Sequence, residues 1–112
     1  YFGVSEPPYR SWRWEDLSLD LGGPDLLILQ DGTRVVGART RIRGERRTVV
    51  GVLKDDGRVT NLVELPSGGD TGYPGLVQHD GDIWASYYSS HEGKPSIYMA
   101  RIPRRELSDT VP

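Results

Sequence analysis

The sequence predicts an all-β protein, and three observations carry that prediction. Fourteen glycines and eight prolines stand among only 112 residues, a composition that favours short elements joined by tight turns. Apolar and polar residues alternate over short runs, as in half-buried strands, and helical periodicity is not sustained anywhere. Related strand-turn-strand segments recur about 50 residues apart. We therefore expect repeated antiparallel sheets.

Turn chemistry delimits the strands. Asp-Gly pairs at residues 31–32, 56–57 and 80–81 are typical of tight hairpin turns. The run RTRIRGERR (39–47) and the run SSHEG (89–93) are expected at two further hairpin tips. The strands are expected in this order along the chain: 1–4, 12–17, 24–29, 34–39, 47–53, 59–65, 74–78, 82–88 and 95–102.

Two copies of one supersecondary unit are visible. PDLLILQDGTRVVGAR (24–39) and PGLVQHDGDIWASYY (74–88) share a proline, an apolar strand, an Asp-Gly turn and a second strand with a polar end. A third strand follows in each copy, as RTVVGVL and PSIYMAR. A period of roughly 40–50 residues with four strands per unit is typical of a β-propeller blade. We expect the end of one blade in 1–20, a whole blade in 21–66 and most of the next in 67–112.

The blade count predicts an incomplete ring. Propellers close with about 4–8 blades, and this chain would supply only two to two and a half. We expect the chain to be a piece of a longer protein whose remaining blades complete the ring. Association of several copies into one ring is the alternative.

Composition and charge argue against several classes of function. A net charge of −2 gives no overall field toward nucleic acid or anionic membranes, and the five arginines of RTRIRGERR lack the interleaved aromatics of a nucleic-acid surface. No apolar run approaches the length of a membrane span. The chain has no cysteine, and its only histidines, His79 and His91, lie at different turns. We therefore expect no metal and no cofactor.

Two short segments stand at the turn after the third strand of a unit, SEPPYRSW (5–12) and LKDDGRVT (53–60). The first contains Ser5, Ser11 and Trp12, and the second contains Asp55 and Gly57. Together they resemble the Asp box, Ser-x-Asp-x-Gly-x-Thr-Trp, which the sialidase superfamily carries in this turn, with Ser11 in place of the threonine. Sialidases are six-bladed propellers that remove terminal sialic acid. The resemblance implies a sialidase-type propeller.

Two further segments resemble the sialidase active-site pattern. LLILQDGTRVVGAR ends at Arg39, which the resemblance makes one of the arginines that bind the substrate carboxylate. GYPGLVQHDG is similar to a family motif that places Tyr73 at the nucleophilic tyrosine. The glutamate that partners this tyrosine in the family would stand near Gly23, where Asp25 is the nearest carboxylate. The run ELPSGGDTGYPGL, with SYYSSHEGKPSIYMAR after it, is similar to the C-terminal part of uncharacterised bacterial sialidase-like proteins.

The chemistry of these residue types agrees with those roles. The Arg39 guanidinium is suited to a carboxylate because it offers two parallel hydrogen bonds that lysine cannot reproduce. A neutral phenol such as Tyr73 avoids repulsion with an anionic sugar and can attack if a carboxylate accepts its proton. Asp25 and Asp70 are the candidate partners, with turn capping as the alternative role for each.

The polar cluster at the end of the last hairpin supplies further candidate contacts. Tyr88, His91 and Glu92 are expected to bind substrate from a rim loop, with a plain hairpin tip as the alternative. Strand alternation should send Tyr87 and Tyr88 to opposite faces. We expect the tryptophans Trp12, Trp14 and Trp84 to pack between sheets.

Three functions remain open from the sequence. The first is a secreted or periplasmic sialidase-like glycoside hydrolase that acts on terminal anionic sugars. The second is a non-catalytic propeller that binds a glycan or a protein, and the third is a propeller glycosidase for neutral sugars that uses carboxylates alone. Because the family places its general-acid aspartate and first arginine in earlier blades, we expect this chain alone to be inactive.

Overall fold

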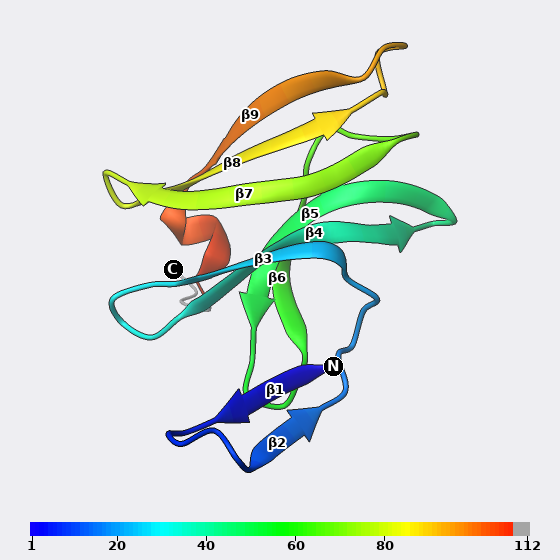
Figure 1. The fold of residues 1–112 in the computed structure, drawn as a ribbon. Coiled ribbons are helices and arrows are strands. Elements are labelled where there is room, and N and C mark those ends of the chain that lie inside the picture. The colour runs from blue at the N-terminus through cyan, green and yellow to red at the C-terminus, as the bar shows by residue number, and fades with distance from the viewer. Residues whose placement is uncertain (109–112) are drawn as a thin grey trace.

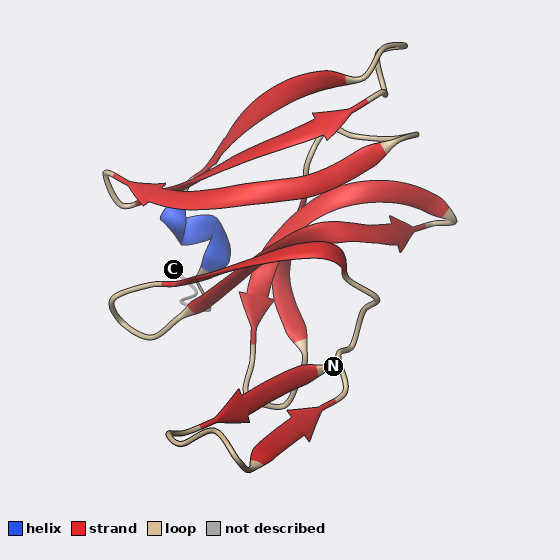
Figure 2. Ribbon diagram, viewed as in Figure 1, coloured by secondary structure: helices blue, strands red, loops and turns tan. Residues whose placement is uncertain are grey.

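A computed structural model describes residues 1–108 and confirms the all-β prediction (Figures 1 and 2). All of the expected strands are present in this part of the chain, and a single turn of 3-10 helix, η1 (Arg104–Leu107), follows them without having been predicted. No helix among these residues is long and apolar enough to cross a membrane. The strands are β1 (Phe2–Ser5), β2 (Trp12–Glu15), β3 (Gly22–Ile28), β4 (Arg34–Ile42), β5 (Glu45–Leu53), β6 (Val59–Glu64), β7 (Thr71–His79), β8 (Asp82–Ser89) and β9 (Ser96–Ile102).

The strands form three antiparallel sheets, each made of consecutive strands. The first sheet pairs β1 with β2, the second has the order β3-β4-β5-β6, and the third has the order β7-β8-β9. Figure 1 shows them one after another, with the third sheet at the top and the first at the bottom. Tight turns at Arg43-Gly44 and Asp80-Gly81 have positive φ at both residues, which is the type I′ geometry that suits the twist of a hairpin.

The second and third sheets begin with equivalent strand pairs. Gly22 on β3 lies opposite Arg39 on β4, and Gly72 on β7 lies opposite Tyr88 on β8. In the sequence repeat Gly22 corresponds to Gly72, and Arg39 corresponds to Tyr88. The internal repeat therefore extends to the hydrogen-bond register, and it places Arg39 and Tyr88 at corresponding positions of neighbouring sheets.

A bulge follows each of these opening pairs. The register of β3 against β4 shifts between Gly22 and Asp25, and that of β7 against β8 shifts between Gly72 and Gly75. Within the first bulge Gly23 has a φ of 55°, and within the second Tyr73 has a φ of 48°. Glycine adopts this conformation freely, whereas a tyrosine is held there only by its surroundings.

The main core lies between the second and third sheets. The residues that form it are buried side chains from both sheets and from η1, namely Leu29, Val35, Val50, Val52, Leu65, Leu76, Ile83, Ala85, Tyr87, Ile102 and Leu107. At Gly37 the two sheets approach so closely that an added Cβ would lie 3.1 Å from Cγ of Pro74 and 3.2 Å from Cδ2 of Leu76. This close approach fixes the start of β7 against β4, where the candidate site lies.

The two tryptophans of the first sheet do not pack between sheets as the sequence predicted. Trp12 and Trp14 stack on each other with ring centroids 5.6 Å apart, but they are 50% and 60% exposed and do not fill a space between sheets. The reason is that no further sheet of the described chain lies over this face. Trp84, in contrast, is half-buried. The segment after β2 joins the second sheet at Ser18, whose Oγ accepts a hydrogen bond from the Val59 amide at 3.0 Å.

Candidate functional site

Four of the residues singled out in the sequence meet at one end of the second and third sheets. They are Arg39 in β4, Tyr88 near the end of β8, Tyr73 in the bulge of β7, and Asp70 just before β7. The repeat explains why they meet, since Arg39 pairs with Gly22 at the start of β3 and Tyr88 pairs with Gly72 at the start of β7, at the same edge of the stacked sheets. This group is the candidate site.

Arg39 lies between the starts of β3 and β7, close to a glycine on each strand. A Cβ on Gly22 would lie 3.3 Å from Nη2 of Arg39, and a Cβ on Gly72 would lie 3.4 Å from Cβ of Arg39. Among residues 1–108 no carboxylate lies within the 4.0 Å that defines an ion pair with this arginine. The half-buried guanidinium therefore keeps its donors for a ligand.

Tyr73 and Tyr88 form a stacked pair beside this arginine. Their ring centroids are 6.2 Å apart with an interplanar angle of 21°. Tyr73 is 71% exposed, and Gly23 forms the surface beneath it, because a Cβ there would lie 2.9 Å from ring carbons of Tyr73. The tyrosine in the strained conformation is thus supported by the glycine at the equivalent place of the neighbouring sheet.

The phenol–carboxylate pair of the site is formed by Tyr88 and Asp70. The Tyr88 hydroxyl donates a hydrogen bond of 2.9 Å to Oδ1 of Asp70. This hydrogen bond raises the pKa of Tyr88, and desolvation and the charge of Asp70 act in the same direction, against a smaller opposing effect of Arg39. Tyr88 is therefore a neutral phenol with a carboxylate in place to accept its proton. The hydroxyl of Tyr73 makes no hydrogen bond to any of the described residues.

Asp25 has a definite structural contact. Its Oδ2 accepts a hydrogen bond of 2.8 Å from the backbone N–H of Leu76. Since Asp25 lies on β3 and Leu76 on β7, this bond joins the second sheet to the third at the edge of the candidate site. One carboxylate oxygen of Asp25 is thereby occupied.

A buried network of hydroxyls holds the segment that carries Asp70. Ser89 is 0% exposed, and its Oγ accepts the N–H of Gly68 at 3.1 Å. Next to it, Ser90 Oγ accepts the N–H of Asp70 at 2.9 Å, and the Ser90 N–H donates to the Asp70 carbonyl at 2.9 Å. The serines of the SYYSS run thus act on the backbone of the connection between β6 and β7, and they fix the position of the Asp70 carboxylate.

The same network continues into the second sheet through two threonines that are both 0% exposed. The Thr71 hydroxyl donates to the Tyr88 carbonyl at 2.7 Å. Because it has only one proton, the 2.7 Å contact between the hydroxyls of Thr48 and Thr71 must be donated by Thr48. Thr48 also donates its backbone N–H to Ser67 Oγ at 2.9 Å. The site is therefore tied to the core of both sheets.

Sequence reasoning missed these positioning residues, although one signal was present. In β8 the inward positions are Ile83, Ala85, Tyr87 and Ser89, and all of them are buried. A serine at the end of an otherwise apolar inward series needs a polar partner. Its presence at position 89 indicates that a backbone segment, here the one around Gly68, must lie against it.

His91 and Glu92 are engaged in contacts within the last hairpin. Nδ1 of His91 lies 2.7 Å from Ser89 Oγ, and its ring lies 4.8 Å from the ring of Tyr98. The Tyr98 hydroxyl donates to Oε1 of Glu92 at 2.5 Å. Residues 1–108 contain no group of three or more histidine or acidic side chains that could hold a metal ion. His91 also lines one of two clefts next to the site.

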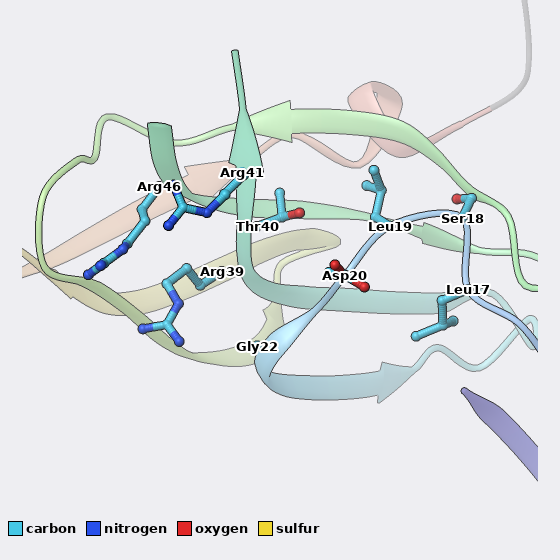
Figure 3. A pocket seen from close by; sticks show the side chains of 9 residues that line it. All are labelled: Leu17, Ser18, Leu19, Asp20, Gly22, Arg39, Thr40, Arg41 and Arg46. Atoms are coloured by element: carbon cyan, nitrogen blue, oxygen red, sulfur yellow. The ribbon is translucent and has the colours of Figure 1, made fainter. Parts of the chain in front are cut away.

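Two adjacent clefts flank the arginines at the end of the second sheet. The first has a volume of about 670 Å³, and Figure 3 shows Arg39, Arg41 and Arg46 on one side of it and the segment 17–20 on the other. The second, of about 750 Å³, is lined by Arg41 and Arg46 again, together with residues 67–70 and His91. Both clefts are open to solvent and fall within the size range of ligand pockets.

Comparisons with known proteins give no further identification. No protein-family model matches the chain, and neither a curated protein nor a solved structure matches it. The sialidase resemblance therefore depends on the motifs quoted above.

Proposed function

We propose that this chain is part of a secreted or periplasmic sialidase-like β-propeller glycoside hydrolase and that its Arg39 binds the carboxylate of an anionic sugar. One observation carries the proposal. A guanidinium without a carboxylate partner among residues 1–108 lines an open cleft, and the neighbouring sheet carries, outside that cleft, a stacked tyrosine pair and a phenol–carboxylate pair. A carboxylate is the ligand that such a guanidinium binds with two parallel hydrogen bonds.

The outer face of the third sheet supports the propeller part of the proposal. Val77, Ile97 and Met99 are 58%, 80% and 65% exposed there. Their equivalents in the second sheet, by the common register, include Thr48 and Val50, which are buried under the third sheet. If the repeat continues, another blade covers this apolar face. Exposed apolar side chains gathered on one face otherwise favour association with a partner.

The contacts within the site support a division of roles. The hydrogen bond to Asp70 supports Tyr88 as the nucleophile, since the carboxylate can take the phenol proton as the Tyr88 oxygen attacks the anomeric carbon. The departing oxygen would be protonated by an acid outside this chain, and water would then release the sugar. Tyr73, which the sequence resemblance places at the nucleophile, is exposed and parallel to Tyr88, which suits it to contact the sugar ring. Asp25 serves the joint between the sheets.

The second candidate is a non-catalytic glycan-binding propeller. It is favoured by the position of Asp25, because the carboxylate nearest to the family's glutamate is occupied by the Leu76 amide. This candidate retains the role of Arg39 but not that of the Tyr88–Asp70 pair.

A binding assay with matched variants tests the proposal. Calorimetric or NMR titration of the 112-residue chain with N-acetylneuraminic acid should give an affinity on the order of millimolar. Arg39→Ala should abolish it, and Arg39→Lys should lose most of it, while Arg13→Ala, an exposed arginine of the first sheet, should not change it. Equal affinity in the wild type and Arg39→Ala would refute the proposal, and binding of neutral sugars by both would favour the neutral-sugar glycosidase.

Catalysis is tested in the full-length parent protein. With a fluorogenic sialoside, Tyr88→Phe should abolish turnover and Tyr73→Phe should reduce it less. Retained binding with no turnover in the wild-type parent would establish the non-catalytic candidate instead.

A further inference from the structure

The hairpin between β4 and β5 separates its five arginines into two groups. Arg43 donates to both carboxylate oxygens of Glu64 at 3.2 Å, and Arg47 donates to Glu64 at 2.8 Å and also to Glu45. Two arginines of the hairpin are thus neutralised by acidic neighbours. The other three, Arg39, Arg41 and Arg46, have no carboxylate within ion-pair distance in residues 1–108.

The strand register brings the unneutralised arginines together. Arg41 lies directly opposite Arg46 in the ladder, and Arg39 lies two residues before Arg41 on the same face of β4. Figure 3 shows the side chains of Arg41 and Arg46 next to each other and that of Arg39 below them. Like charges directly opposite each other on a sheet destabilise the folded chain. The fold therefore maintains a repulsive pair that a bound anion would relieve.

The position of this pair sets it apart from Arg39. Arg41 and Arg46 border both clefts, whereas Arg39 borders only the first. Asp20 lines the first cleft, and Asp70 and Glu45 line the second. None of these carboxylates lies within ion-pair distance of Arg39, Arg41 or Arg46 in residues 1–108, and Glu45 pairs with Arg47 instead. Each cleft is large enough for a sugar ring. A ligand that fills both would pass directly over Arg41 and Arg46.

We infer that the site takes an acidic oligosaccharide with negative groups on two neighbouring sugars, one bound by Arg39 and the other by the Arg41–Arg46 pair. The inference rests on the proposed function for its first anionic group and adds the second. Two guanidiniums on opposite strands present a fork of donors to one carboxylate or sulfate group. The second cleft, with its exposed Gly69 and the neighbouring His91, receives the sugar that carries it.

The test compares ligands with one and two charges on the same protein. The ligands are N-acetylneuraminic acid, its α2,8-linked dimer, and a monosulfated heparin disaccharide with a carboxylate on one sugar and a sulfate on the other, titrated by calorimetry at low salt. We expect one of the two-charge ligands to bind at least about tenfold more tightly than the monomer, and the identity of that ligand distinguishes a carboxylate from a sulfate as the second group. Equal affinity for all three would overturn the inference.

Matched variants separate this inference from the proposed function. Arg41→Gln/Arg46→Gln should abolish the preference for the two-charge ligand: its affinity should fall by at least about tenfold, whereas the affinity for the monomer, which binds at Arg39 in the cleft that these arginines also border, should fall much less. Arg10→Ala/Arg13→Ala removes the same charge from the first sheet and should change neither affinity. An equal effect of both double variants would overturn the inference by showing that only net charge matters.

Folding of the variant gives an independent readout. Arg41→Gln/Arg46→Gln removes two opposed charges and also the hydrogen bond from Arg41 to the Gly44 carbonyl at 3.2 Å, so it should unfold at nearly the same temperature as the wild type. If Arg39→Ala leaves monomer binding intact while the glutamine variant still loses the two-charge preference, the proposed function fails and the second anion site stands. If the glutamine variant retains the full preference, the inference fails and the proposed function is unaffected.

Discussion

Thr71→Val should destabilise the fold far more than the loss of one oxygen atom suggests. Thr71 is 0% exposed. Its hydroxyl accepts a hydrogen bond from the Thr48 hydroxyl and donates one to the Tyr88 carbonyl, each with a length of 2.7 Å. Valine has the same shape, so the change removes two hydrogen bonds and leaves the buried Thr48 donor without an acceptor. With about 1 kcal/mol for each of the two bonds and about 1–3 kcal/mol for the unpaired donor, we expect a loss of about 3–5 kcal/mol.

The reciprocal change sharpens this prediction. Thr48→Val removes only one bond, and Thr71 still donates to Tyr88, so the loss should be about 1 kcal/mol. The double variant lacks the unpaired donor and should be no less stable than Thr71→Val alone, which makes the two changes non-additive. Thr60→Val is the control, because the buried Thr60 hydroxyl has no hydrogen-bond partner among the described residues. It should be neutral or stabilising.

Urea unfolding followed by tryptophan fluorescence measures these differences, provided that the transitions remain two-state. The order of stability should be Thr60→Val, Thr48→Val, then Thr71→Val. If Thr71→Val lies within about 0.5 kcal/mol of the wild type, or if Thr48→Val is the more destabilising change, the hydrogen-bond assignment is wrong.

Three further predictions concern the site and its supports. Gly23→Ala should shift the Tyr73 ring and destabilise the fold, since the new Cβ would lie 2.9 Å from that ring at a φ of 55°; unchanged near-ultraviolet circular dichroism and stability would contradict this. Desolvation raises the pKa of Glu64, but hydrogen bonds from its two arginine partners outweigh it and hold that pKa below its usual range. A carboxyl whose pKa is lower in the folded state stabilises the fold at pH values above its unfolded pKa, and this contribution is lost as pH falls through the folded pKa. Glu64→Gln should therefore be less stable than the wild type at neutral pH, and it should lose less stability than the wild type below about pH 4.5. Parallel profiles of stability against pH for the two proteins would contradict this. Asp70→Asn should lower the pKa of Tyr88 toward its ordinary value, because the hydrogen bond to the carboxylate and the carboxylate's charge both raise that pKa. An unchanged ultraviolet titration of the tyrosines would show that the contact is absent in solution.

The strands could be predicted because their signals are local. Alternation and Asp-Gly turns located every strand, and the repeat of 24–39 in 74–88 anticipated the matching register of the second and third sheets. The start of β7 at Thr71 was missed, because Tyr73-Pro74 resembles a loop in sequence and is a bulge in the structure. The short η1 was missed because one helical turn carries no periodicity.

The site could be predicted only in part because its pairings are long-range. The repeat indicated that Arg39 and the end of β8 share one edge. No local pattern shows that Leu76 engages Asp25, 51 residues away. Likewise, which arginines of the hairpin stay unneutralised depends on where β6 places Glu64.

The most direct test of the central claim is the NMR signal of the Arg39 side-chain Nε–H during titration with N-acetylneuraminic acid. Arg39→Lys provides the assignment, and the methyl ester of the same sugar provides the control without a negative charge. A saturable shift of this signal with the acid, absent with the ester, is the predicted result. No shift with the acid, or the same shift with the ester, would contradict carboxylate binding at Arg39.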